Sequence, residues 1–190
     1  ESDYARAFKP AEVPLDRTGL SEFGMGMKSA ACWLSREWVV RTTALGEDVE
    51  RTVSFDVSAI IEHRLEELAI HVSDASVRSH YTEITLSGIH KMPQGRTIGK
   101  IKEHLASIYR TFLRNGILEL SWDRDILAYD EPKVLSAPLY RTQTADPILW
   151  RKEIDFDFGE GQRAWGFAAL REKGNVSGSG FALFRRGRVI

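Results

Sequence analysis

Covalent cross-links and membrane anchors are what this sequence lacks most clearly. Among its 190 residues there is one cysteine, Cys32, which excludes an intrachain disulfide and a cysteine-based zinc cage. No apolar run approaches the length of a membrane span, and no signal peptide is visible. We therefore expect a cytoplasmic protein with no membrane partner, in which Cys32 is a buried and unreactive thiol.

Net charge is also nearly absent. The 26 basic and 27 acidic side chains leave a formal charge of -1, which gives no attractive field for nucleic acid, although nucleic acid stays open as a partner. The five histidines show no metal-ligand spacing with carboxylates, so we expect no metal ligands. The content of 43% hydrophobic and 28% charged residues is typical of a globular protein with one large or two small domains.

The most informative stretch is Glu22-Phe23-Gly24-Met25-Gly26-Met27-Lys28, which continues into Ala30, Ala31 and Leu34. Two glycines one residue apart indicate a tight turn or a close approach to another group. The small and apolar residues that follow predict a helix packed on a sheet. A glycine turn that opens a helix leaves free N–H groups at the positive end of the helix dipole, where phosphate commonly binds. An ordinary turn without a ligand is the alternative.

The spacing of these glycines fits neither the Walker loop nor the dinucleotide fingerprint. It resembles the glycine box at the end of the lid in GHKL ATPases, the superfamily of gyrase, the ninety-kilodalton heat-shock chaperone, histidine kinases, MutL proteins and the microrchidia ATPases. The chaperone and microrchidia branches are the most similar. The resemblance implies that backbone N–H groups contact ATP phosphates at Gly24, Met25, Gly26, Met27 and Lys28. The Lys28 ammonium could add a point charge, or it could simply be solvated.

A second resemblance lies downstream, in the alternating strand Tyr81–Ser87. Thr82, Ile84 and Leu86 are similar to the Gly-Thr-x-Ile-x-Leu strand that ends GHKL nucleotide domains, whose threonine lies near the glycine box. Tyr81 stands where that family has glycine. The resemblance implies that Thr82 belongs to the phosphate site, whereas an ordinary amphipathic strand is the alternative.

The remaining first half predicts familiar elements. Residues 1–18 have no sustained period and could be a nucleotide lid or a disordered chain end. The runs Val39–Ala44 and Val49–Val57 predict a hairpin, and Asp56 or Ser58 can cap a short helix after it. Lys91–Arg96 has the composition of a linker.

In the second half, Thr97 can cap a helix that runs to about Asn115 and stops at Gly116. Seven of its apolar residues share one face, which we expect to be buried, with Lys102 on the solvent side. Strand-rich segments follow: 117–122, 126–129, 150–158, 163–170 and 181–186, with a hairpin turn at 159–161. The ending Phe181–Ile190 resembles a strand of the transducer domain of microrchidia-type ATPases.

These features predict an α+β chain with two domains. By the resemblance, residues 1–95 are the C-terminal part of a Bergerat-type (histidine kinase-like ATPase) α/β sandwich. Residues 96–190 begin a ribosomal-protein-like α+β transducer domain. Arg186 or Arg188 could reach the γ-phosphate, as a basic residue of that domain does in some relatives, or could be solvated or structural.

Two catalytic segments of the family are not found before Gly19. One is the helix with a Glu base and a Mg²⁺-binding Asn, and the other is the Asp-x-Gly-x-Gly segment that binds adenine. We therefore expect no catalytic residue here, and we expect ATP and Mg²⁺ as cofactors, and hydrolysis, only in an intact parent ATPase. A homodimer is left open. The alternative is a non-catalytic interaction module or a nucleic-acid-associated transducer fragment.

Overall fold

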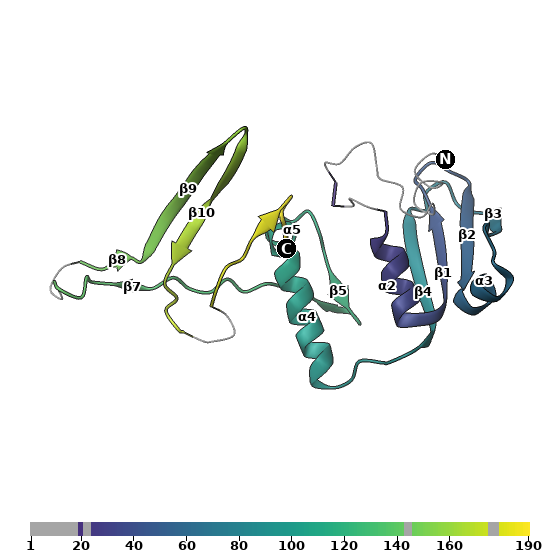
Figure 1. The fold of residues 1–190 in the computed structure, drawn as a ribbon, viewed down its shortest axis with the longest axis horizontal. Coiled ribbons are helices and arrows are strands. Elements are labelled where there is room, and N and C mark those ends of the chain that lie inside the picture. The colour runs from purple at the N-terminus through teal and green to yellow at the C-terminus, as the bar shows by residue number, and fades with distance from the viewer. Residues whose placement is uncertain (1–18, 21–23, 143–145, 175–178) are drawn as a thin grey trace. The chain divides into compact units, whose positions relative to one another are not determined.

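The computed structural model describes residues 19–20, 24–142, 146–174 and 179–190. Helices and strands are mixed along them, which confirms the expected α+β class (Figure 1). The chain divides into two compact units between Ile98 and Gly99. The lid segment expected before residue 19 lies outside the described residues, as do Glu22 and Phe23 of the glycine stretch.

The first unit is a four-stranded antiparallel sheet with the order β3-β2-β1-β4. Its strands are β1 (Ser35–Thr43), β2 (Val49–Asp56), β3 (Ile70–Asp74) and β4 (Tyr81–Ile89). The β1–β2 hairpin predicted from alternation is confirmed, and Gly46 in its turn has a φ of 88°. Because β1 pairs with β4 as well as β2, β1 is a central strand and β4 is an edge.

Two helices accompany this sheet: α2 (Gly26–Leu34) and α3 (Val57–His63). The predicted cap of α3 is confirmed at Asp56, whose carboxylate accepts from the Ala59 N–H at 2.9 Å. Helix α2 passes directly into β1, and the buried Ser35 hydroxyl donates to the Ala31 carbonyl at 2.9 Å across the junction. Cys32 is exposed on α2, so the expectation of a buried thiol is wrong.

The core of the first unit lies between α2 and one face of the sheet. Ala31, Trp38 and Val40 are buried there, and the indole of Trp38 stacks on the Phe55 ring at a centroid distance of 3.7 Å. Met27 and Leu86 pack against this cluster. Because Met27 lies in the first turn of α2 and Val40 follows Trp38 by two residues, α2 folds back along β1. Its N-terminus therefore points toward the Thr43 end of the strand.

The long helix predicted in the second half is interrupted. It forms α4 (Arg96–Ile108) and α5 (Arg110–Arg114), with Tyr109 between them at φ −99° and ψ 11°. Thr97 lies inside α4 and does not cap it, because the helix already begins at Arg96; the Thr97 N–H bonds to the Gln94 carbonyl in a tight preceding turn. Gly116 has a φ of 66°, in keeping with its expected role as a helix stop.

The apolar stripe of this interrupted helix is half-buried, so the expectation of a fully buried face is wrong. Lys102 is also misplaced by the sequence pattern: its side chain is only 25% exposed, and its ammonium lies 2.6 Å from the Asp125 carboxylate. Asp125, on the strand segment after α5, therefore lies beside the face of the helix that was expected to point into solvent.

Where the structure describes the second unit, its named strands pair as two-stranded hairpins, and Val134 and Arg171 form an isolated bridge. The hairpins are β5–β6 (Ser121–Trp122, Asp125–Ile126), β7–β8 (Ser136–Ala137, Ile148–Leu149), β9–β10 (Arg151–Gly159, Gln162–Ala169) and β11–β12 (Phe184–Arg185, Arg188–Val189). The predicted turn at 159–161 is confirmed, with positive φ at all three residues. The predicted strands at 117–122, 126–129 and 181–186 are much shorter than expected, and β7–β8 was not predicted. No helix in the described part of the chain is long and apolar enough to cross a membrane.

Candidate phosphate-binding site

The glycine stretch forms a left-handed turn followed by a helix without a side-chain cap. Gly24 has a φ of 62°, a conformation that glycine adopts without strain. Met25 is the N-cap residue and makes no side-chain cap, and the first helical bond joins the Ser29 N–H to the Met25 carbonyl at 2.9 Å. The N–H groups of Gly26, Met27 and Lys28 come before that bond, so they have no acceptor within their own helix. This end of α2 can accept an anion.

Lys28 places its ammonium at the same end of the helix. Its Nζ donates to the Gly24 carbonyl at 2.8 Å, so the side chain folds back over the turn and is half-buried. The side chain that was expected to be either solvated or phosphate-directed therefore lies where it could contact a phosphate.

The structure explains why glycine is needed at one of the two positions in the stretch but not at the other. Gly24 is required by its positive φ. Gly26 is helical, and a Cβ built on it would meet no atom of the described residues within 4 Å. A helical glycine destabilises a helix by roughly 0.5–1 kcal/mol relative to alanine, and nothing in the described fold compensates for this. The turn alone therefore accounts for Gly24 but not for Gly26.

Thr82 lies on the α2 side of the sheet, near the end toward which the helix N-terminus points. It pairs with Thr42 across β1 and β4, and the two hydroxyl oxygens are 2.8 Å apart. Thr82 is exposed and Thr42 is half-buried. From Leu34, α2 reaches back about 12 Å to Gly26, whereas β1 extends about 26 Å to Thr42. Thr82 is thus about 14 Å farther along the sheet than the start of the helix. Thr82 and the N-terminus of α2 therefore lie toward the same end of the sheet but are not in contact.

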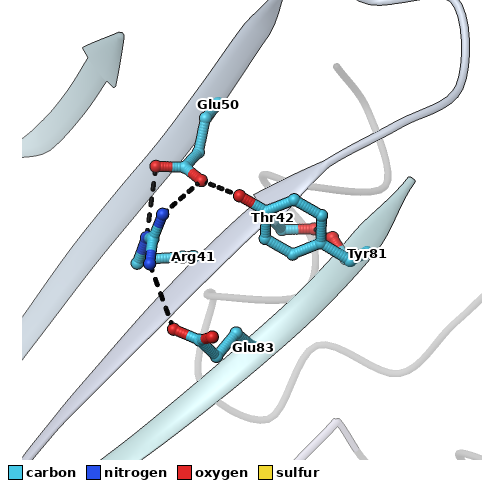
Figure 2. Close-up of polar contacts among 5 residues, drawn as sticks. All are labelled: Arg41, Thr42, Glu50, Tyr81 and Glu83. Carbon is cyan, nitrogen blue, oxygen red and sulfur yellow. Dashed lines mark hydrogen bonds and ion pairs between the residues drawn. The ribbon is translucent and has the colours of Figure 1, made fainter. Parts of the chain in front are cut away.

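Sequence reasoning missed a polar network on the opposite face of the sheet (Figure 2). Its members are Arg41 on β1, Glu50 on β2, and Tyr81 and Glu83 on β4. Arg41 donates to both Glu50 oxygens at 3.2 and 2.9 Å and to Glu83 at 3.2 Å, and the Tyr81 hydroxyl donates to Glu50. The alternation of each strand was readable, but the pairing register that brings the four residues together was not.

The network shifts the acidity of its members. Hydrogen bonds from Arg41 and then from Tyr81 hold the pKa of Glu50 below its usual value, against the opposing effect of burial. The same contact with Glu50 raises the pKa of Tyr81. Glu50 is only 9% exposed, and a carboxylate so placed needs partners of this kind to stay charged.

Two acidic side chains of the second unit form ordinary surface ion pairs. Asp155 forms an ion pair with Arg163 across β9 and β10, which lowers the pKa of that carboxyl, and Asp125 pairs with Lys102. Within the described ranges, no three His, Cys, Asp or Glu side chains gather as a metal site would require. Arg186 lies in the β11–β12 turn with a φ of 52°, and Arg188 lies on β12.

Comparison of the chain with protein-family models, with curated proteins and with solved structures finds no match.

Proposed function

We propose that this chain binds the phosphates of ATP at the N-terminus of α2, as the phosphate side of a GHKL-type nucleotide site. The observation that carries the proposal is Gly26, a helical glycine that neither backbone conformation nor packing among the described residues requires, and that lies at a helix N-terminus. A ligand that approaches the backbone closely is one physical reason for a residue without a Cβ at such a position. In this proposal the first unit is part of a Bergerat-type sandwich, and the second unit is a transducer-like domain.

Two further features support a phosphate rather than a neutral ligand. The N–H groups at the start of α2, which have no acceptor within the helix, and the Lys28 ammonium are all donors, and they lie at one end of the helix. The Thr42–Thr82 hydroxyl pair lies farther along the same end of the sheet, where it could meet a distal part of a polyphosphate or its Mg²⁺.

Hydrolysis is proposed only for an intact parent protein that supplies the Glu base, the Mg²⁺-binding Asn and the adenine-binding Asp. The role proposed for the present 190 residues is to bind phosphate and to couple the nucleotide state to the second unit. A cytoplasmic location and ATP-dependent homodimerisation belong to the same proposal.

The experiment is isothermal titration of the intact gene product with a non-hydrolysable ATP analogue and Mg²⁺, comparing wild type, Gly26→Ala and Gly99→Ala. Gly99 is a matched control, because it is also helical and a Cβ there also meets no atom within 4 Å. We expect Gly26→Ala to abolish binding, because its methyl group occupies the space next to the N–H donors, and Gly99→Ala to bind normally.

Stability separates the two interpretations of Gly26. Both alanine variants should keep or slightly raise the urea midpoint, since alanine is the better helix former. Loss of binding in a folded and undiminished Gly26→Ala protein would assign Gly26 to the ligand. Unchanged affinity would overturn the proposal and return the chain to the interaction-module alternative.

A further inference from the structure

Thr82 lies on β4, an edge strand, so the position of its hydroxyl depends on how firmly β4 is held in register. β4 has one sheet neighbour, β1, and the ladder between them ends at the pair Thr43–Tyr81. Thr82 is therefore one residue from the open end of the strand. Strand ends and edges are the parts of a sheet that open most easily.

Both neighbours of Thr82 in the chain are held on the opposite face. Tyr81 binds Glu50 of β2 through its hydroxyl, and Glu83 binds Arg41 of β1 at 3.2 Å. Arg41 also donates hydrogen bonds from Nε and Nη2 to the Glu50 carboxylate, so its guanidinium links β1 to both β2 and β4. Figure 2 shows Arg41 lying between the two carboxylates, with the Tyr81 hydroxyl directed at Glu50.

The consequence for Thr82 follows from strand geometry. Successive side chains point to opposite faces, so a slip of β4 by one residue would carry Thr82 from the α2 side to the other side. The same slip would separate Tyr81 and Glu83 from their partners. A partly buried, charged network of this kind specifies register more than it adds stability.

We propose that Arg41 is the positioning residue for Thr82: through Glu50, Tyr81 and Glu83 it locks the register of β4 and so fixes the Thr82 hydroxyl on the α2 side. This inference rests on the proposed function, since the purpose of the lock is to present Thr82 to the phosphate-bound ligand. Arg41 acts through β4 and does not contact the ligand.

The test is a double-mutant cycle on the intact gene product, titrated with the non-hydrolysable ATP analogue and Mg²⁺. The variants are Arg41→Gln, Thr82→Val and the double variant. We expect Arg41→Gln to weaken binding about three- to tenfold when Thr82 is present and to have no further effect in the Thr82→Val background. Equal weakening in both backgrounds would overturn the inference, because it would mean a general structural effect.

A second measurement does not depend on nucleotide. In Arg41→Gln, amide hydrogen exchange should increase at Tyr81–Glu83 and stay unchanged at Ser87–Ile89, at the other end of β4. Unchanged exchange at Tyr81–Glu83 would overturn the lock. If Arg41→Gln does not fold, Glu83→Gln removes only the more exposed contact and should give a smaller effect of the same kind.

The two proposals fail in different ways. Loss of binding in Gly26→Ala, together with full binding in Arg41→Gln and Thr82→Val, would overturn the positioning role and leave the phosphate site intact. Absence of binding by the wild-type protein would overturn the proposed function and this inference with it, whatever the exchange data show.

Discussion

The two units of the chain differ in how deeply the apolar residues of their main hairpins are buried. In the first, Trp38, Val40 and Val53 are at most 2% exposed, because α2 packs over the centre of the four-stranded sheet. In the second, the β9–β10 hairpin leaves Phe156 and Phe158 more than half exposed. The register places both on one face with the small residues of β10, and a two-stranded hairpin provides no second layer.

This difference shows that amphipathic alternation is necessary for a core but does not create one. Both hairpins alternate in sequence, and both pair in register. Only the first has a helix close enough in the chain to cover it, since α2 runs into β1 without a loop. Among the described residues of the second unit, the fully buried hydrophobic side chains are those of Ala106 and Leu127.

The largest expected effect is at Trp38. Trp38→Ala should lower the free energy of unfolding by about 3–5 kcal/mol, through lost burial and the cavity left beside Phe55. Trp165→Ala, at a tryptophan that is 82% exposed, should change it by no more than about 0.5 kcal/mol. Urea unfolding of both variants, followed by circular dichroism, checks this. Similar losses for the two would contradict the contrast between the units.

A smaller effect is expected at Leu105 in α4. A fully buried stripe would predict a loss of about 2–5 kcal/mol for Leu105→Ala. Because Leu105 is half-buried, we expect about 1–2 kcal/mol instead. Lys100→Ala is the exposed control and should change the free energy of unfolding by less than about 0.5 kcal/mol. A loss above about 3 kcal/mol, measured by urea unfolding, would show that the second unit has a tighter core than described.

The two glycines of the phosphate site should differ in sign. Gly24→Ala forces a side chain into the left-handed region and should destabilise the first unit by about 1 kcal/mol. Gly26→Ala should stabilise it by up to about 1 kcal/mol. Thermal unfolding of the pair gives the comparison directly, and a destabilised Gly26→Ala protein would point to a packing role that the fold does not contain.

The subtlest effect is on pH dependence. The pKa of Glu50 is lower in the fold than in the unfolded chain, so its contribution is present above the unfolded value, near pH 4.3, and is lost as pH falls through the lower folded value. Arg41 is the main cause of that shift. Arg41→Met should therefore flatten the fall of the urea midpoint below about pH 4. An acid limb as steep as that of the wild type would exclude the network as its source.

The sequence was sufficient wherever structure is set by neighbours along the chain. The Asp56 cap, the hairpin turn at 159–161 and the helix after the glycines depend on local hydrogen bonds and on the backbone freedom of glycine, which residue types reveal directly. The interruption of the helix at Tyr109 and the tight turn before Thr97 are also local features, but the residue types at these positions do not predict them.

Tertiary structure alone decided which distant residues meet. The Arg41 network joins residues up to 42 positions apart, and only the register of β1 with β2 and β4 brings them together. The same register places Thr82 beside Thr42, and the fold of α2 along β1 directs the glycine turn toward them. Alternation says which side chains share a face of a strand, but the choice of partner strand depends on the packing energy of the whole unit.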